Sequence, residues 1–299
     1  MSSVDNWADW ILNRRHGGDP AELERTLARV GKIRDRVLAN GEVAAGDTLL
    51  DVGTGDGLIA FGALAYVGAS GRVILSDISH DLLDHARQLA NHMDVARQCT
   101  FVHASADDLS AIADESIDVI TTRSVLAYVE NKPRAFAEFA RVLRPDRRIS
   151  HYEPINRLTH PEPEHRFDGY DVTPVQDLAH RINAVFGSRQ PIGIDPMFDF
   201  DERDLVGIAQ AAGFGEVHLE LHVDVTPHVP QRWEVYAGSA ANPLAPTLIE
   251  AMEEALAADE RVRFVAHLQP RVEQGDGTFS VATAYLWGAR GRSRASVPP

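Results

Sequence analysis

The spacing of apolar residues changes repeatedly along the first half of the chain. Short apolar runs, typical of buried parallel strands, occupy residues 48–52, 71–77, 99–104, 116–122 and 147–152. The segments between them show the three- and four-residue spacing of amphipathic helices, most clearly at 80–92. Strands that alternate with helices predict right-handed crossovers and a doubly wound, mostly parallel sheet. The pattern therefore predicts an α/β fold.

The alternation breaks after Pro154. Residues 154–199 are rich in Pro, His, Asp and Arg, and their clearest helical stretch is Val175–Phe186. We interpret this segment as a cap inserted beside a ligand crevice and not as an independent domain. The alternation then resumes, with helices expected at 201–212 and 246–258 and strands expected at 216–225 and 279–289.

These elements predict five consecutive parts of the chain. They are N-terminal helices that form a lid (1–44), a ligand-binding core (45–153), the cap (154–199), the completion of the core (200–289) and a disordered tail (290–299). The tail is assigned from its content of Gly, Ser and Pro, which cannot bury enough apolar surface to fold.

Composition and charge argue against several classes of protein. The formal net charge of −15 over 299 residues disfavours a nucleic-acid partner, because phosphate binding requires a concentrated basic surface. The single cysteine, Cys99, cannot form an internal disulfide and fits a reducing compartment. No stretch holds 18 consecutive apolar residues, so no membrane span is predicted. We expect a soluble, cytoplasmic protein with no membrane partner.

The most informative motif is LLDVGTGDG at residues 49–57. An apolar run ends at Asp51, and Gly53, Gly55 and Gly57 follow at alternate positions. Glycine permits unusual dihedral angles and lets a ligand approach the main chain closely. The N–H groups at a helix start favour electron-rich ligand atoms. The turn is therefore predicted to bind a flat, polar ligand such as a nucleoside.

Four features together identify a family. The glycine spacing is G-x-G-x-G, where a dinucleotide-binding turn requires G-x-G-x-x-G. Asp77 ends the second strand, twenty residues beyond Gly57, and HASADDL (103–109) follows the third. Residues 118–150 read as a fourth strand, a loop and a helix before the fifth strand. On these features the chain resembles the class I S-adenosylmethionine (SAM)-dependent methyltransferases. The resemblance implies a seven-stranded, Rossmann-like methyltransferase fold with SAM as cofactor.

The resemblance assigns the glycine turn to the methionine end of SAM. In this family the acid at the strand end and the turn after it contact the methionine amino and carboxylate groups. That role is implied here for Asp51, Gly53, Thr54, Gly55 and Gly57. The alternative for Asp51 is a carboxylate that only caps the following helix.

The resemblance assigns the end of the second strand to the nucleoside. Asp77 is implied to accept hydrogen bonds from both ribose hydroxyls, and Ile78 to pack on the adenine. The alternative for Asp77 is to cap the helix that follows, a role that Ser79 fills better.

The adenine edge is implied to lie on the amides of Ala106 and Asp107. Ser105 stands where the family usually has an aspartate, so the contact to the adenine amino group falls to Ser105, Asp107 or Asp108. Arg123 and Ser124 are implied to lie beside the methionyl group.

The end of the chain favours the same family over an NAD(P)-dependent oxidoreductase. Residues FGEVHLELHVDV and FSVATAYLWGA look like the reversed final hairpin typical of methyltransferases. A dinucleotide dehydrogenase would continue with further parallel strands.

Candidates for catalysis lie where strands four and five end, because ligands bind outside the carboxyl ends of parallel strands. His151 and Glu153 stand two residues apart and share one face of a strand, and His151 titrates near neutral pH by default. Tyr128 stands where related small-molecule methyltransferases often have a histidine. The alternatives are a hydrogen-bonded core role for His151 and packing against the cap for Tyr128. A general base is needed only when the acceptor still carries its proton.

Two further groups of residues admit two interpretations each. The first group is in the cap and either binds an anionic acceptor or consists of solvated loop residues: Arg157, His160, His165 and Arg166. No metal is expected, since the spacing of the two histidines matches no zinc motif. Near the N-terminus, Trp7, Trp10, Arg14 and Arg15 form a lid over the cofactor, or the tryptophans are a hydrophobic anchor.

The sequence therefore predicts a methyltransferase acting on a small molecule, in specialised metabolism and natural-product biosynthesis. Oxygen is the favoured acceptor atom, with nitrogen and carbon next. A short peptide or its carboxylate is an alternative acceptor, and a homodimer is an alternative to a monomer. An NAD(P)-dependent oxidoreductase and a non-catalytic nucleoside-binding protein remain as alternative functions.

Overall fold

The chain folds into two compact units, each built from segments that are separated in the sequence. A computed structural model describes residues 5–15 and 19–291. The larger unit contains 27–154, 200–221 and the residues from Thr283 onward. The smaller unit contains the N-terminal residues up to Thr26 together with 155–199 and 222–282. The sequence pattern assigned 222–282 to the completion of the core, whereas the contacts group these residues with 155–199.

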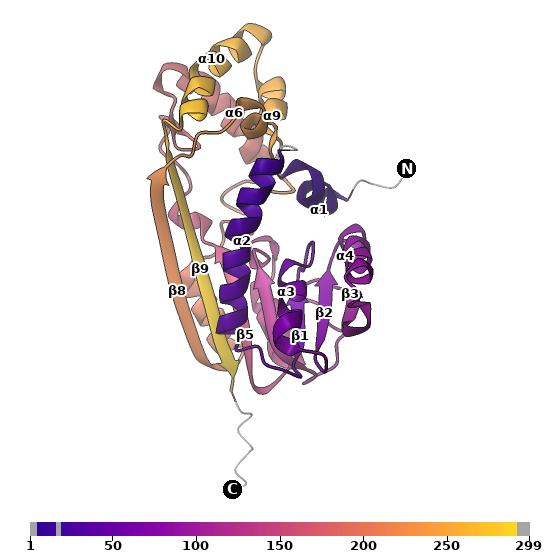
Figure 1. The fold of residues 1–299 in the computed structure, drawn as a ribbon. Coiled ribbons are helices and arrows are strands. Elements are labelled where there is room, and N and C mark those ends of the chain that lie inside the picture. Colours follow the sequence, from indigo (N-terminus) through magenta and orange to yellow (C-terminus); the bar gives the residue numbers. More distant parts are fainter. Residues whose placement is uncertain (1–4, 16–18, 292–299) are drawn as a thin grey trace. The chain divides into compact units, whose positions relative to one another are not determined.

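A seven-stranded sheet forms the centre of the larger unit (Figure 1). Its strand order is β3-β2-β1-β4-β5-β9-β8. The strands are β1 (Thr48–Val52), β2 (Arg72–Asp77), β3 (Cys99–His103), β4 (Ile117–Arg123), β5 (Leu143–Pro154), β8 (Phe214–Pro227) and β9 (Thr278–Arg290). The first five strands pair in parallel, and β9 runs antiparallel to β5. The predicted fold class and the reversed final strand are thereby confirmed.

Strand β5 begins earlier than the apolar pattern indicates. Its register with β4 jumps from Leu143 to Arg148 while β4 advances only from Ile117 to Val119. The intervening Asp146 has a φ of 60°, so the turn expected at Pro145–Arg147 is retained as a bulge inside the strand. Strand β9 includes Arg290, the first residue of the predicted disordered tail, and 292–299 lie outside the described residues.

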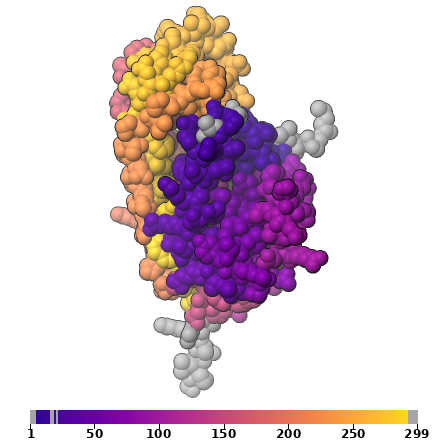
Figure 2. Space-filling view, viewed as in Figure 1, coloured from indigo at the N-terminus to yellow at the C-terminus, as the bar shows by residue number. Residues whose placement is uncertain are grey.

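Helices of the larger unit bury their apolar stripes against the sheet. They are α2 (Pro20–Asn40, whose first turns belong to the smaller unit), α3 (Leu58–Val67), α4 (His80–His92), α5 (Lys132–Val142) and α7 (Glu202–Ala211). Side chains from α2, α3 and α4 join one cluster with β1 and β2, and residues such as Val37, Ala63 and Leu75 are completely buried there. On the side shown in the space-filling view, α2 and the residues that follow it cover the strands (Figure 2).

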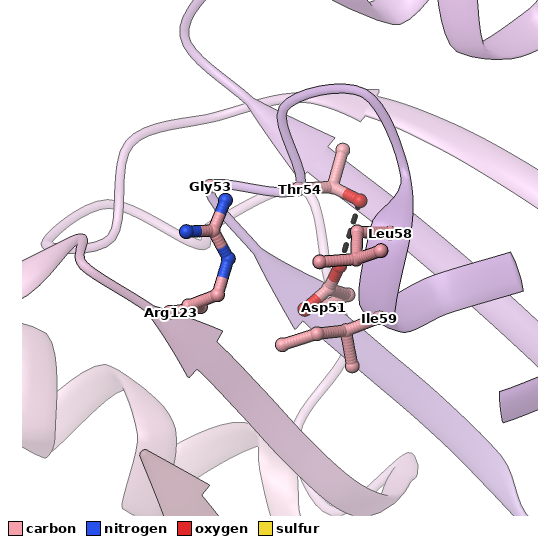
Figure 3. A pocket seen from close by; sticks show the side chains of 6 residues that line it. All are labelled: Asp51, Gly53, Thr54, Leu58, Ile59 and Arg123. Carbon is pink, nitrogen blue, oxygen red and sulfur yellow. Dashed lines mark hydrogen bonds between the residues drawn. The ribbon is translucent and has the colours of Figure 1, made fainter. Parts of the chain in front are cut away.

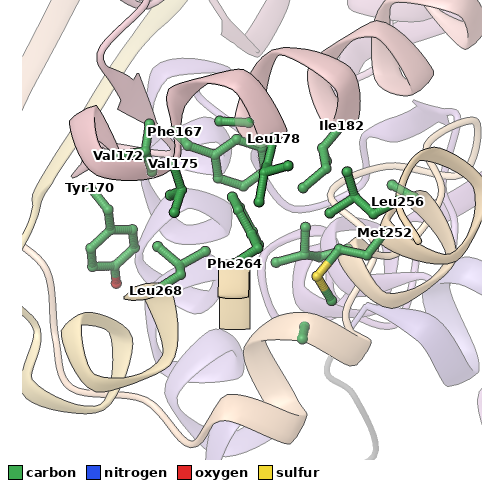
Figure 4. Packing of buried hydrophobic residues seen from close by; sticks show 14 of the residues in the cluster. Phe167, Tyr170, Val172, Val175, Leu178, Ile182, Met252, Leu256, Phe264 and Leu268 are labelled. Atoms are coloured by element: carbon green, nitrogen blue, oxygen red, sulfur yellow. The ribbon is translucent and has the colours of Figure 1, made fainter. Parts of the chain in front are cut away.

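The smaller unit has its own hydrophobic core (Figure 4). It contains α1 (Asn6–Asp9), a π-helical turn (Trp10–Arg14), two short strands β6 (Arg166–Phe167) and β7 (Tyr170–Asp171), and the helices α6 (Gln176–Arg189), α8 (Trp233–Gly238), α9 (Leu248–Ala255) and α10 (Ala258–Gln274). Phe264 and Leu268 of α10 are completely buried against Leu178 and Ile182 of α6. The described part of the chain holds no helix both long and apolar enough to cross a membrane.

The helix predicted at 246–258 is in fact two helices. Leu256 and Ala257 are extended between them, and Glu260 accepts a hydrogen bond from the Ala257 amide at 2.8 Å. This acceptor satisfies an amide at the start of α10 and begins a new helix in a different direction. Helix α10 itself was not predicted, although Phe264, Leu268 and Val272 stand four apart, the spacing of one helix face.

Replacing Phe264 tests the core of the smaller unit. We expect Phe264→Ala to lower the free energy of unfolding by about 3–5 kcal/mol, because a buried aromatic ring leaves a cavity. Val262→Ala on the same helix, where the side chain is 70% exposed, is the matched control and should change it by less than about 0.5 kcal/mol. Urea denaturation followed by circular dichroism measures both. Equal effects of the two substitutions would show that Phe264 contributes no core packing.

Candidate active site

The glycine turn after β1 has a backbone that only glycine adopts easily. Gly53, Gly55 and Gly57 have φ angles of 62°, 58° and 84°. A Cβ atom on Gly53 would lie 2.5 Å from Cγ2 of Val125, which follows β4. The turn therefore passes close to the loop after β4, and α3 begins directly beyond it at Leu58.

Asp51 lies buried beneath this turn. Its carboxylate accepts hydrogen bonds from the hydroxyls of Thr54 (2.7 Å) and Thr121 (2.8 Å). Burial raises the pKa of Asp51 to about 6, and these hydroxyls and the Ala60 amide in the first turn of α3 partly oppose that rise. The contact with Ala60 supports the helix-capping interpretation of Asp51. Asp51 holds the glycine turn through these hydrogen bonds and, when ionised, places a negative charge beneath the turn.

A small pocket opens at this turn (Figure 3). It is lined by Asp51, Gly53, Thr54, Leu58, Ile59 and Arg123. A carboxylate and a guanidinium in one small pocket suit the ammonium and carboxylate groups of an amino acid. The residues present therefore fit the methionine end of SAM.

Asp77 connects the glycine turn to the start of α4. One carboxylate oxygen accepts from the Gly55 amide and the other from the Ser79 amide, both at 2.9 Å. Ser79 caps α4 by accepting from the Leu82 amide at 3.0 Å, as predicted. Each carboxylate oxygen has two lone pairs, so an oxygen of Asp77 can accept more than one hydrogen bond.

The strand ends beside Asp77 form a surface suited to a flat ring. Ile78 is 48% exposed, and its carbonyl contacts Nε2 of His103 at 2.9 Å. The rings of His80 and His103 stack at 3.8 Å between centroids. The sequence analysis did not single out these two histidines, although both stand within three residues of predicted strand ends.

The segment expected to edge the adenine is a tight turn. The Ser105 hydroxyl donates to the Asp107 carboxylate, and the Asp108 amide donates to the Ser105 carbonyl at 3.2 Å. Ala106 is buried. Because Ser105 and Asp107 bond to each other, they form one polar group at the position where the family has a single aspartate.

Glu153 shapes the loop that follows β4. Its buried carboxylate accepts from the amides of Val125 and Leu126 at 3.1 Å and of Ala127 at 3.3 Å. Burial raises the pKa of Glu153 to about 7, and these amide hydrogen bonds partly oppose that rise. The loop also contains Ser124 with a φ of 55°, a conformation that costs free energy unless neighbouring contacts hold it. Glu153 thus holds the loop that follows Arg123.

His151 is enclosed by aromatic side chains. Its ring lies 5.4 Å from that of Phe136 and 5.5 Å from that of Phe139, and 1% of the residue is exposed. Burial lowers the pKa of His151 to about 3, so the imidazole is neutral at physiological pH. Its Nε2 atom has no hydrogen-bond partner among the described residues. This environment favours the hydrogen-bonded core role over the role of general base.

Thr122 links His151 to Glu153. Its hydroxyl lies 2.9 Å from Nδ1 of His151 and 3.2 Å from Oε1 of Glu153. A hydroxyl carries one proton, and the Glu153 carboxylate can only accept when it is ionised. The consistent assignment is that Nδ1–H of His151 donates to Thr122, whose hydroxyl donates to Glu153.

The remaining candidates stand in two places. Tyr128 is the last residue of a 3₁₀ turn (Leu126–Tyr128) and is half-buried. It follows directly in the sequence after the residues whose amides donate to Glu153. In the smaller unit, Arg157, His160 and His165 are exposed, and Arg166 donates to the Gly169 carbonyl at 3.2 Å. No group of three metal-ligating side chains occurs among the residues described.

The N-terminal residues contact other segments of the smaller unit, to which they belong. The Trp10 indole donates to the Ala240 carbonyl at 2.8 Å, and the Arg15 guanidinium lies 5.1 Å from the Trp10 ring. Arg14 forms an ion pair with Glu250 at 2.5 Å. These contacts hold Trp10, Arg14 and Arg15 within the smaller unit. Trp7 is half-buried on α1.

Comparisons with known proteins agree with this geometry. Residues 50–150 match a family model described as "Methyltransferase domain". The ubiquinone/menaquinone biosynthesis C-methyltransferase UbiE of Klebsiella pneumoniae is 29% identical over 177 residues, which cover 58% of this chain and 69% of that protein. Residues 50–150 form a methyltransferase domain of the class I SAM-dependent type. It is an enzyme that uses SAM as its methyl donor.

Solved structures support the fold of the methyltransferase. A geranyl diphosphate methyltransferase in complex with SAM superposes with a TM-score of 0.54 at 17% identity, over 92% of this chain and 94% of that one. The YcgJ protein of Bacillus subtilis superposes with a TM-score of 0.52 at 17% identity, over 90% of this chain and all of that one. At such identities the likeness concerns the fold alone.

Asp77→Ala tests the predicted ribose contact. We expect the Asp77→Ala variant to bind S-adenosylhomocysteine more weakly than the wild type by about 1.5–3 kcal/mol, the range for a hydrogen bond to a charged group. Asp81→Ala, an exposed acid in the first turn of α4, is the control and should bind normally. Isothermal titration calorimetry measures both affinities. Unchanged affinity in Asp77→Ala would contradict the ribose role.

Asp51→Asn tests the buried charge under the turn. The folded pKa of about 6 exceeds the ordinary value of 3.8, so ionisation of Asp51 destabilises the fold as pH rises through this interval. The wild type should lose about 3 kcal/mol of unfolding free energy to this group between about pH 4 and pH 7. Asp51→Asn should remove that dependence and weaken S-adenosylhomocysteine binding. Denaturation series at several pH values, with the exposed Asp84→Asn as control, measure it. A pH dependence identical to the wild type would contradict the assignment.

Proposed function

We propose that this enzyme transfers the methyl group of SAM to a small-molecule acceptor whose attacking atom carries no proton that must first be removed. The observation that carries the proposal is the combination of a pocket suited to an amino acid with two enclosed strand-end residues. His151 is neutral and surrounded by phenylalanines, and Glu153 is bonded to three loop amides. Neither side chain is in a position to take a proton from an acceptor.

Methyl transfer then depends on alignment. The reaction displaces a neutral thioether from carbon, and holding nucleophile, methyl and sulfur in line supplies much of the acceleration. Asp51 and Arg123 would fix the methionine end of SAM, and Asp77 would fix its ribose. Glu153 would act as a positioning residue, because it holds the loop that follows β4 through its amides.

The acceptor we favour is a small metabolite with an ionised oxygen, such as a carboxylate or an acidic hydroxyl. Carbon is the second candidate, because the UbiE relatives are named C-methyltransferases of ubiquinone and menaquinone biosynthesis. The net charge of −15 disfavours polyanionic acceptors. A role in natural-product biosynthesis in the cytoplasm is part of the same proposal, and a short peptide remains the alternative acceptor.

Transfer of an isotopically labelled methyl group tests this proposal. Purified enzyme is incubated with labelled SAM and panels of carboxylic acids, phenols, quinol precursors, amines and short peptides. Mass spectrometry then identifies the methylated atom. Methylation of a small molecule supports the proposal, whereas methylation of peptides alone, or of none of the small molecules, would contradict it.

Two substitutions separate positioning from base catalysis. We expect His151→Phe to keep turnover within about fivefold of the wild type, whereas loss of a general base typically costs about 10²–10⁴-fold. Glu153→Ala should lower both turnover and S-adenosylhomocysteine affinity, because three loop amides lose their acceptor. Steady-state kinetics and calorimetry on both variants provide the readout. A large loss of turnover in His151→Phe with normal cofactor affinity would restore His151 as the base.

A further inference from the structure

Arg123 brings an unpaired guanidinium to the pocket at the glycine turn. The residue is half-buried at the end of β4, and its side chain makes no hydrogen bond or ion pair with the residues that the structure describes. A guanidinium has five N–H donors, and withdrawing it from water is unfavourable unless acceptors take the place of the water. Arg123 is therefore suited to an anionic group of a ligand, such as the methionine carboxylate of SAM.

Tyr152 continues the same face of the sheet on the next strand. It is the register partner of Arg123, and paired residues on neighbouring strands lie about 4.8 Å apart and point to the same face. On its other side Tyr152 pairs with Tyr285 of β9, and the two rings lie 5.0 Å apart. Tyr152 also forms a side-chain hydrogen bond with Thr283. The Tyr152 side chain therefore lies one strand away from the pocket that fits the methionine end of SAM.

Helix α2 brings a second guanidinium to this face. Arg29 and Arg36 stand seven residues apart, which places them two turns apart on the same side of the helix. Arg36 lies over the Tyr285 ring, 4.8 Å from its centroid, and forms an ion pair with Glu220. Arg29 is exposed and, unlike Arg36, makes no hydrogen bond or ion pair in the described part of the chain. Arg29 thus presents an unpaired positive charge on the side of α2 that faces β9.

Both unpaired arginines act on the Tyr152 hydroxyl. Burial raises the pKa of Tyr152 above its ordinary value of 10.0, and the hydrogen bond with Thr283 partly opposes that rise. The positive charges of Arg29 and Arg123 oppose it as well, so both guanidiniums lie near the phenol. Because the hydrogen bond lowers the pKa, Thr283 donates to the phenol oxygen and leaves the hydroxyl proton of Tyr152 for an acceptor on a ligand. All four residues belong to the larger unit.

We infer that Arg29 and Tyr152 bind a carboxylate of the methyl acceptor. A guanidinium pairs with a carboxylate through two parallel N–H···O bonds, and a tyrosine hydroxyl can donate a third bond. Arg123 remains with the methionine end of SAM, in the pocket that it shares with Asp51. The acceptor and the cofactor would then occupy neighbouring strand ends. This inference rests on the proposed function and narrows the acceptor to molecules that carry a free carboxylate.

Binding of simple acids to the full-length enzyme, saturated with S-adenosylhomocysteine, tests the inference. The probes are benzoate, phenylacetate and hexanoate, and each is compared with its neutral amide. We expect at least one acid to bind about 10- to 100-fold more tightly than its amide, the range for a hydrogen bond to a charged group. Titration calorimetry measures the affinities. Equal binding of acids and amides to the wild type would overturn the inference.

Substitutions assign the preference for acids to particular residues. Arg29→Gln should abolish the preference, whereas Arg29→Lys should keep part of it, because an ammonium retains the charge but not the planar fork. Tyr152→Phe should weaken binding of the acids by about two- to tenfold. Lys32→Gln removes the same charge from an exposed position of α2, so this matched control should bind the acids as the wild type does. A preference that survives in Arg29→Gln would contradict the inference.

Affinity for S-adenosylhomocysteine separates the two sources of a carboxylate. Arg29→Gln should bind this molecule as the wild type does, which also shows that the variant is folded. A tenfold or greater loss would show that Arg29 binds the carboxylate of the cofactor, and would overturn the inference. The proposed function fails separately: an Arg29-dependent preference for acids without methylation of any small molecule would contradict methyl transfer to such acceptors and leave the carboxylate site in place.

Discussion

Three buried carboxylates at the ends of parallel strands hold the candidate site together. Asp51, Asp77 and Glu153 end or nearly end β1, β2 and β5, and each accepts hydrogen bonds from the loop beside it. Burying a carboxylate is unfavourable unless donors surround it. Here the donors are amides and hydroxyls of the loops themselves. Each loop therefore takes its shape from the carboxylate, and each carboxylate tolerates burial because of the loop.

The strand order explains where these loops meet. The order reverses between β1 and β4, which lie next to each other at the middle of the sheet. Ligands of doubly wound folds bind at such a reversal, outside the carboxyl ends of the strands. Asp51 and Gly53 arrive from β1, and Arg123 arrives from β4. Two segments that lie some seventy residues apart in the sequence therefore meet at one pocket, as the hydrogen bond between Thr121 and Asp51 also shows.

The sequence predicts the local features well, because they depend on neighbouring residues. The alternation of strands and helices, the glycine turn and the cap at Ser79 all follow from patterns a few residues long. The burial of His151 could not be predicted, because strand periodicity gives the face of a side chain but not what covers it. Here Phe136 and Phe139, from a preceding helix, cover it. The amide partners of Glu153 are also distant, 26 to 28 residues earlier in the chain.

The order of strands along the chain affects how the molecule is made. Strand β9 lies between β5 and β8 in the sheet, yet it follows both of them in the sequence. A chain still emerging from the ribosome has β5 and β8 complete but lacks the strand that joins them. Long-range strand pairing is slow and leaves edges open while it waits. Until β9 is synthesised, the nascent chain therefore has open strand edges at both β5 and β8.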